Sequence, residues 1–300
     1  MLLVLSFVFF MLLGLPLFGV IGLASIISMI GMPFPMEFIP QNLYTGMDQF
    51  PLIATIGFVM AGFLMEPAGI TGEIIEVAKK AVGNIRGGLA MVTILACMIF
   101  AALSGSGPAT TAAVGSMTIP FMVALGYDRQ WSAGVVAVAG GLGVIIPPSI
   151  PFVLYSLATG VSTGDLFLAG VIPGILIGLF MMAYAVIFCI TKGEDKQRIR
   201  AKMSELRGNG FLKLFADSFF ALLCPIIVLG GIYSATEAAC VSVFYALFVS
   251  LVVYRSITLK DLIPFLASSV KTYGGLAFVL AFATAFGRVL SLTRATKVIE

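Results

Sequence analysis

Two long stretches of this chain carry no charged side chain, and each is interrupted by glycine and proline. Asp, Glu, Lys and Arg are absent from residues 88–126 and from residues 131–163. Glycine and proline interrupt the first stretch at residues 104–111 (SGSGPATT) and the second at residues 140–151 (GGLGVIIPPSIP). Both residue types stop a helix, because proline lacks the backbone donor and glycine tolerates strained backbone. Broken backbone within a membrane survives only where it is buried in protein or lines a polar site, so the two breaks predict a functional site.

The composition is typical of a membrane protein. Of the 300 residues, 60% are hydrophobic and 10% are charged, whereas soluble domains carry about 25% charged residues. The sequence therefore predicts an all-α polytopic membrane protein embedded in the lipid bilayer. Residues 1–30 lack a basic leader and a small-residue cleavage site and are long enough to span, so we expect a helix there rather than a signal peptide. The net charge is +3, with the basic residues at predicted membrane surfaces, and we expect no nucleic-acid binding.

The residue types of the chain do not indicate an enzyme. The chain has no histidine, so Ser104 and Ser106 lack the usual general base of a serine hydrolase. Each of the four cysteines lies in a separate apolar segment, without metal-ligand spacing, and fits a packing role best. We therefore expect neither an enzyme nor a cofactor. The four cysteines are Cys97, Cys189, Cys224 and Cys240.

Apolar runs of helical length indicate a series of helices. Residues 73–82 carry Glu and Lys on one face and apolar side chains on the other, which is typical of a helix at the membrane interface, and residues 261–270 resemble them. Residues 166–190 hold glycine at every fourth position from Gly170 to Gly178, which favours close helix packing. The other expected spans are residues 1–30, bent near residues 14–16, and residues 50–65, 132–159, 215–233, 238–254 and 271–290.

The first break lies between two apolar arms that are short for full spans. Two short spans or a re-entrant hairpin over residues 87–125 would both fit. The hairpin is favoured, because a tip of Gly, Ser and Pro belongs inside protein rather than at a headgroup surface. The second break divides the expected span 132–159 near Pro147 and Pro148. Paired interruptions of this kind are the best sequence indication of the binding site of a secondary transporter.

Positive charge gives the expected sidedness. Residues 191–213 contain seven lysines and arginines, so the positive-inside rule places this loop in the cytoplasm. Counting back through the spans places residues 162–165 outside and the N-terminus in the cytoplasm. Trp131 follows the charged turn at residues 128–129 and is expected to be an interfacial anchor.

Several motifs in order give the chain a resemblance to a known family. It resembles the large membrane (M) subunit of tripartite ATP-independent periplasmic (TRAP) transporters, of the C4-dicarboxylate type. The resemblance covers essentially the whole chain. The matching motifs are RGGLA at residues 86–90, SGSG at 104–107, GYD at 126–128, IPPS at 146–149, AGVIPG at 169–174 and TEAA at 236–239.

The resemblance implies a permease subunit of a sodium-coupled symport system in the bacterial inner (plasma) membrane. Its substrate would be an organic acid, a C4-dicarboxylate or a similar carboxylate. Its partners would be a small membrane subunit and a periplasmic substrate-binding protein, with sodium as the coupling ion. An elevator-type mechanism is implied, in which re-entrant hairpins and broken helices move against a scaffold. An ion channel and a non-transporting, truncated assembly protein are the alternatives.

The resemblance also implies a division of the chain into four segments. Residues 1–83 would be scaffold helices and an interfacial arm helix. Residues 84–160, with the re-entrant hairpin and the broken helix, would form the first half of the transport domain. Residues 161–210 would be a span with the basic cytoplasmic loop, and residues 211–300 the opening helices of a second repeat. Since the family continues through a second hairpin and a second Pro-Pro break, we expect the second repeat to be incomplete in this chain.

Sodium is a hard cation that takes oxygen ligands, which the carbonyl ends of broken helices supply. The expected sodium ligands are Ser104, Gly105, Ser106, Gly141, Gly143 and Ile145, with Ser104, Gly105 and Gly143 at the centre of this metal site. The helix N-termini after the breaks suit a substrate carboxylate. The expected substrate contacts are Ser106, Thr110, Pro148 and Ser149. We expect Glu237 to cap a helix, and Arg288 to extend to the membrane interface.

Overall fold

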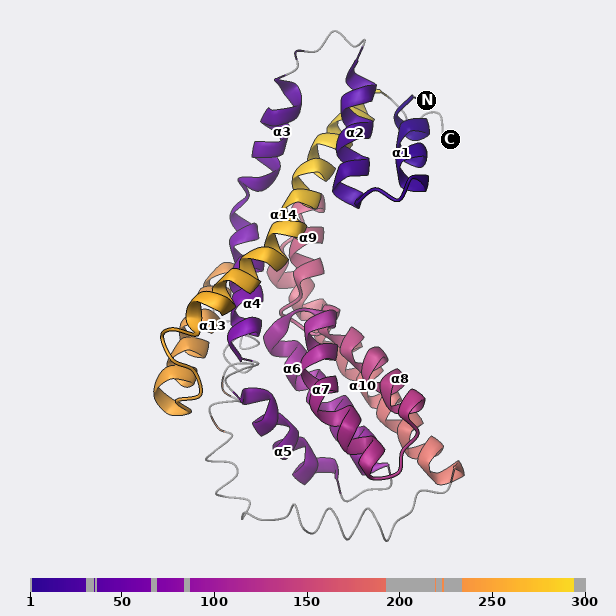
Figure 1. The fold of residues 1–300 in the computed structure, drawn as a ribbon, viewed down its shortest axis with the longest axis vertical. Helices are drawn as coiled ribbons and strands as arrows, with labels where there is room; N and C mark the ends of the chain where they lie inside the picture. Colours follow the sequence, from indigo (N-terminus) through magenta and orange to yellow (C-terminus); the bar gives the residue numbers. More distant parts are fainter. Residues whose placement is uncertain are drawn as a thin grey trace. The chain divides into compact units, whose positions relative to one another are not determined.

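The computed structural model describes residues 2–30, 35, 37–65, 69–83, 87–192, 219, 223 and 234–293 (Figure 1). Every regular element among them is helical, which confirms the all-α prediction. The helices are α1 (Leu2–Leu12), α2 (Leu17–Met29), α3 (Phe38–Met47), α4 (Phe50–Met65), α5 (Ile70–Val82), α6 (Gly88–Ser104), α7 (Gly107–Ala124), α8 (Arg129–Gly140), the 3₁₀ turn η1 (Gly141–Val144), α9 (Ile150–Thr159), α10 (Thr163–Thr191), α13 (Ala235–Phe248), the π-helical turn η2 (Val249–Val253) and α14 (Leu262–Leu292).

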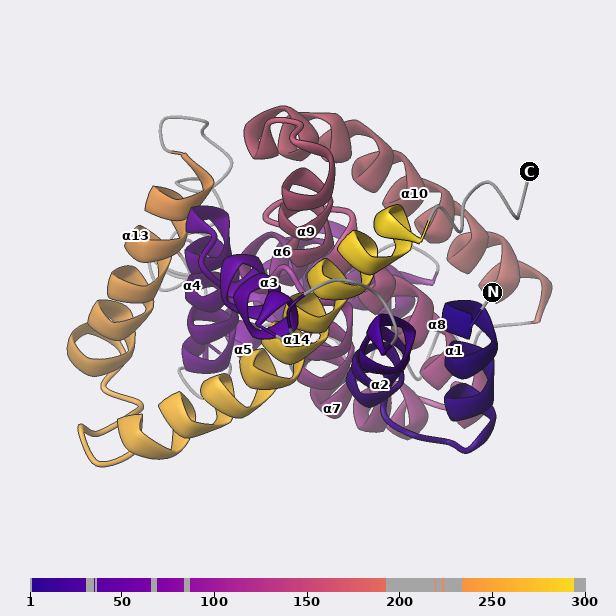
Figure 2. The same ribbon diagram turned by 90° about the horizontal axis from the view of Figure 1, so that it is seen from above.

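The chain forms two compact units, Met1–Leu52 with Val270–Glu300, and Ile53–Ser269. In the first unit, the prediction of one long helix over residues 1–30 is wrong. Gly14 has φ +75° and Pro16 precedes α2, so the chain turns back and α1 and α2 lie side by side (Figure 2). Phe7 of α1 packs on Phe286, with ring centroids 5.7 Å apart.

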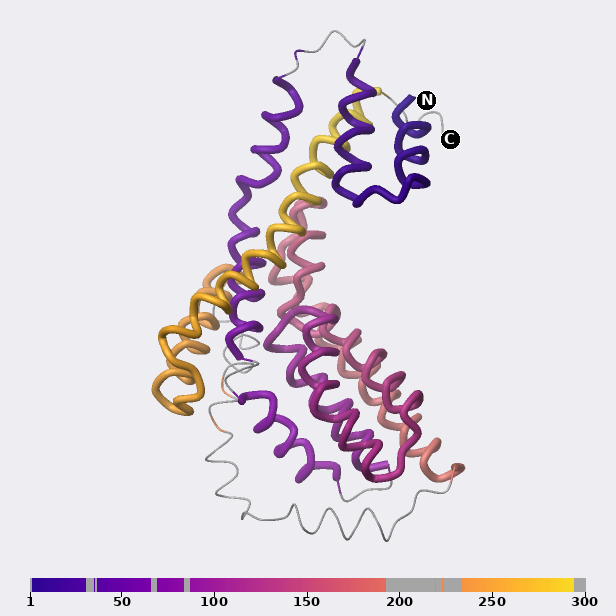
Figure 3. The backbone as a smooth tube through the Cα atoms, in the orientation of Figure 1, coloured from indigo at the N-terminus to yellow at the C-terminus, as the bar shows by residue number. Residues whose placement is uncertain are grey.

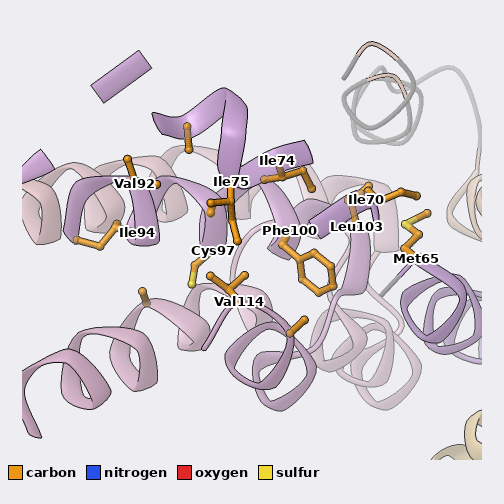
Figure 4. Packing of buried hydrophobic residues seen from close by; sticks show 14 of the residues in the cluster. Met65, Ile70, Ile74, Ile75, Val92, Ile94, Cys97, Phe100, Leu103 and Val114 are labelled. Carbon is orange, nitrogen blue, oxygen red and sulfur yellow. The ribbon is translucent and has the colours of Figure 1, made fainter. Parts of the chain in front are cut away.

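The second unit is built around the hairpin of α6 and α7, which run side by side (Figure 3). This pairing confirms a helical hairpin at the first break; its re-entrant placement in the membrane stays a prediction. The apolar face of α5 packs on α6, with Ile74 fully buried and Ile75 nearly so (Figure 4). Cys97 of α6 lies in the same core, as its expected packing role requires. On the other face of α5, Lys79 pairs with Glu76.

Helix α10 makes close contacts through its glycines, as the spacing predicts. A Cβ atom at Gly174 would lie 2.6 Å from Cγ1 of Ile146, and one at Gly170 would lie 2.6 Å from the carbonyl oxygen of Ile145. The Cβ position at Gly178 is occupied by the side chain of Met98 of α6. The small residues therefore bring α10 against both the hairpin and the second break.

Three of the described helices are long and apolar enough to cross a membrane: α10, α13 together with η2 (Ala235–Val253), and α14. A fourth span results if α3 and α4 together form one. Helix α14 is continuous from Leu262, so the separate interfacial helix expected over residues 261–270 is not present. Pro264 falls in its first turn, where a missing backbone donor costs nothing. The basic loop after Lys192 and most of the span expected over residues 215–233 lie outside the described residues, as do Arg86 and Arg294.

Glu237 caps α13, as predicted. Its Oε2 accepts from the Ser234 backbone N–H at 2.9 Å and from the Ser234 hydroxyl at 2.7 Å, while Ser234 Oγ accepts from the Glu237 N–H at 3.4 Å. This reciprocal pair satisfies donors that a helix N-terminus otherwise leaves free. The carboxylate of Glu237 is therefore engaged in capping the N-terminus of α13.

Candidate ion site at the two helix breaks

The first break is a tight turn between α6 and α7. Gly105 has φ +60°, a conformation that favours glycine, and its N–H closes α6 by donating to the carbonyl of Ala101 at 3.1 Å. Ser106 is the N-cap of α7 and accepts from the N–H of Ala109 at 3.4 Å. Pro108 follows in the first turn, where a helix needs no donor. The sequence thus stops one helix and starts the next within two residues.

The second break unwinds α8 through the 3₁₀ turn η1 and restarts at α9. The side chain of Ser149 forms hydrogen bonds to the segments on both sides of this break. Its hydroxyl donates to the carbonyl of Val144 at 2.7 Å and accepts from the N–H of Phe152 at 3.4 Å. Ser149 is fully buried, so both bonds are made inside the protein.

The structure docks the two breaks directly onto each other. The N–H of Ile150 donates to the carbonyl of Gly105 at 3.2 Å. The backbones leave no room for a side chain: a Cβ atom at Gly105 would lie 2.7 Å from the carbonyl oxygen of Pro148, and one at Gly143 would lie 2.6 Å from that of Ser106. Segments that are about forty residues apart in the sequence therefore form one junction, as the pairing of the breaks predicted.

Buried hydroxyl groups gather at this junction. Ser104 Oγ and Thr110 Oγ1 lie 2.8 Å apart, and Thr110 Oγ1 also donates to the carbonyl of Ser106 at 2.8 Å. Ser104 is 1% exposed and Thr110 is fully buried. A hydroxyl has one proton and two lone pairs, so each oxygen retains a lone pair for a cation in this arrangement.

Both breaks also contain carbonyl groups without a hydrogen-bond donor. No hydrogen bond among the described residues ends on the carbonyls of Ala102, Leu103 or Ser104, because α6 stops at this point. The carbonyl of Gly143 is also without a donor in the described part of the chain, since the residue four positions later is Pro147, which has no N–H. Both breaks thus present unpaired oxygen atoms.

Free donors are scarcer at the junction than free acceptors. In the first turn of α9, the N–H of Ile150 is used by Gly105 and that of Phe152 by Ser149, while Pro151 has none. In α7 the corresponding donor of Ala109 is used by Ser106. The N–H groups of Gly107 and Ser149 have no acceptor among the described residues, and they are fewer than the unpaired carbonyls. Since acceptors dominate, the arrangement suits a cation better than an anion, and the carboxylate contacts expected at Ser106, Thr110, Pro148 and Ser149 stay predictions.

One of the expected ligands faces another helix. The carbonyl oxygen of Ile145 lies against α10 at Gly170, whereas the Cα of Gly141 lies 3.9 Å from the Cβ position at Gly107 of the first break. Sequence reasoning missed Gly62 of α4, where an added Cβ would lie 3.5 Å from the Cα of Ser104. The spacing of the α10 glycines indicated a contact face for Gly170, but nothing distinguishes Gly62 from other glycines in apolar helices.

Residues 4–300 match the family model described as "Tripartite ATP-independent periplasmic transporter, DctM component". The chain belongs to this family. The assignment agrees with the resemblance carried by the sequence motifs. The TRAP permeases are transport proteins rather than enzymes, as the residues indicated.

Curated relatives match most of this TRAP permease chain. The isethionate TRAP transporter permease protein DctMQ of Oleidesulfovibrio alaskensis is 36% identical over 291 residues, 95% of this chain and 45% of the relative. The C4-dicarboxylate TRAP transporter large permease protein DctM of Pseudomonas aeruginosa is 42% identical over 255 residues, 83% of this chain and 58% of the relative. The sialic acid TRAP transporter large permease protein SiaM of Vibrio cholerae is 36% identical over 260 residues, 85% of this chain and 60% of the relative. The chain thus spans 45% to 60% of the length of these relatives.

Proposed function

We propose that this chain is the permease subunit, or the first part of it, of a sodium-coupled transporter that imports an organic acid across the bacterial inner membrane. Family membership supports the transport role. The observation that carries the ion site is the docked pair of breaks, because each break has unpaired carbonyls and the hydroxyls of Ser104 and Thr110 are buried at the junction. Hard cations such as sodium take oxygen ligands of this kind from broken helices.

We favour sodium over a proton as the coupling ion, because the two stretches that form the junction contain no acidic or basic side chain. A proton-coupled site needs a group that titrates, and residues 88–126 and 131–163 contain no Asp, Glu, Lys, Arg or His. The neutral oxygen atoms of the junction can bind a cation without changing protonation state. The direct bond between Gly105 and Ile150 also supports an elevator mechanism, since docked breaks would move as one body.

The substrate class and partners follow from the relatives. Their names specify isethionate, C4-dicarboxylate, sialic acid and 2,3-diketo-L-gulonate. All are organic anions, which supports an organic acid as substrate. As in other systems of this family, a small membrane subunit and a periplasmic substrate-binding protein would complete the transporter.

Sodium binding can be tested without knowing the substrate. A ligand that binds only the folded protein raises its stability in proportion to the logarithm of its concentration. Cys97 and Cys189 are buried whereas Cys240 is exposed, so a thiol-reactive dye reports unfolding of the purified protein once Cys240 is replaced by serine. We expect the melting temperature to rise with NaCl and to rise less with KCl or choline chloride at equal ionic strength. Equal melting curves in all three salts would rule out the sodium site.

The proposed topology predicts which end of α10 faces the cytoplasm. A cysteine introduced at Thr163, in the first turn of α10, should react in intact cells with a membrane-impermeant maleimide. A cysteine introduced at Lys192, which follows the last turn, should react only after the cells are opened. The unsubstituted chain gives the background labelling of its own cysteines. Labelling of the Lys192 variant in intact cells at the rate of the Thr163 variant would invert the topology.

A further inference from the structure

A groove separates α8 from α10 on the outside of the hairpin unit. Both helices pack on α6 (Figure 1). The space between them measures about 490 Å³ and is lined almost entirely by apolar atoms. Ile94 of α6 and Gly134 of α8 are among its lining residues. A Cβ atom at Gly134 would meet nothing within 4 Å, so the absent side chain leaves the groove open at that point.

Aromatic and basic residues mark one end of the groove. Trp131 of α8 lines it and stacks on Phe188 of α10, with ring centroids 4.4 Å apart and planes 8° from parallel. Arg129 begins α8 and Lys192 follows the last residue of α10, so both lie within about a turn of this stack. The carboxylate of the neighbouring Asp128 accepts from the N–H of Trp131 at 2.8 Å. The end of the groove therefore carries two cations and one anion that is engaged as a helix cap.

The size and the charge together point to an amphiphile. A volume of about 490 Å³ is within the range of roughly 300–1,000 Å³ typical of small-molecule sites. Basic side chains at the mouth of an apolar groove between helices, on the side predicted to be cytoplasmic, are suited to an anionic lipid headgroup.

We propose that the groove between α8 and α10 holds one acyl chain of an anionic phospholipid, with its phosphate between Arg129 and Lys192. The acyl chain fills the space over Ile94 and Gly134, and the headgroup neutralises the one net positive charge that Arg129, Lys192 and Asp128 carry together. Helix α8 leads directly into η1 and the second break, so an occupant of this groove would support the helix that carries half of the candidate ion site. The proposal does not depend on sodium coupling or on the identity of the substrate.

Trp131 provides the test, because it is the only tryptophan among the 300 residues. Its fluorescence is measured in the purified protein reconstituted in vesicles that contain brominated phosphatidylglycerol or brominated phosphatidylcholine, since bromine quenches tryptophan on contact. The Trp131→Phe variant supplies the background from any other tryptophan. We expect half-maximal quenching at about a fivefold lower mole fraction of the anionic lipid, because one net positive charge near an anionic headgroup contributes a factor of about five.

Two sets of variants distinguish a specific lipid-binding site from non-specific contact with the bilayer. In the double variant Arg129→Gln with Lys192→Gln, only the negative charge of Asp128 is left, so the preference for the anionic lipid should reverse while quenching by phosphatidylcholine persists. Gly134→Leu should fill the groove and reduce quenching by either lipid, and Gly134→Ala, which adds only a methyl group, should reduce it far less. Equal quenching by the two lipids in the unsubstituted protein would overturn the proposal. Protection of Trp131 from both lipids by the small membrane subunit would also overturn it, because the groove would then be a protein interface.

Discussion

Replacing Gly105 by alanine should weaken sodium binding by about tenfold, which corresponds to about 1.4 kcal/mol, while Gly160→Ala should leave sodium binding unchanged. Both glycines end a helix with positive φ, +60° at Gly105 and +75° at Gly160. An L-residue in this conformation costs roughly 1–2 kcal/mol at either position. Only at Gly105 does the added Cβ meet another part of the chain, the carbonyl oxygen of Pro148 at 2.7 Å. The difference between the variants therefore isolates the docking of the two breaks.

The measurement is the sodium concentration that gives half of the maximal rise in melting temperature, with potassium as the control ion. Both variants should melt at a lower temperature than the parent in the absence of sodium, because they share the backbone strain. The sodium dependence should shift only for Gly105→Ala. If the two variants show the same sodium dependence, the junction packs the helices without binding the ion.

Local chemistry explains how much of this site the sequence could predict. Proline without a donor and glycine with a left-handed backbone stop a helix wherever they stand, so the breaks at Gly105 and at Pro147–Pro148 follow from residue type alone. The capping of α13 by Glu237 is equally local, since both partners lie within four residues. The hairpin follows because two apolar arms with a short polar tip have few other ways to bury that tip.

Contacts between distant segments could not be predicted in the same way. Nothing in the sequence specifies that the N–H of Ile150 donates to the carbonyl of Gly105, so the sequence could not show that this donor of α9 is already engaged. The carbonyl of Ile145 lies against α10 because Gly170 has no side chain, which depends on how two helices meet. The sequence indicated a bend near Gly14, and the complete reversal seen in the structure depends on tertiary packing.

The neighbouring glycines of η1 offer the sharpest matched pair, because they differ in surroundings and not in local structure. Gly143→Ala should abolish most of the stabilisation by sodium, while Gly141→Ala should retain it. A Cβ atom at Gly143 would lie 2.6 Å from the carbonyl oxygen of Ser106 and 2.7 Å from Oγ1 of Thr110. Both atoms belong to the candidate ion site, so they must move apart. A Cβ atom at Gly141 would meet nothing within 4 Å.

The two variants should differ in the sign of their effect on stability as well. Gly141 has φ −58°, which alanine adopts without strain, so Gly141→Ala should stabilise the protein by about 0.4–1 kcal/mol by restricting the unfolded chain. Gly143→Ala should lower the melting temperature, because the backbones of the two breaks are forced apart. Melting curves recorded over a sodium titration measure both effects in one experiment. A Gly143→Ala protein with the parent's sodium dependence would show that Ser106 and Thr110 take no part in binding the ion, and the site would then have to be sought away from the docked breaks.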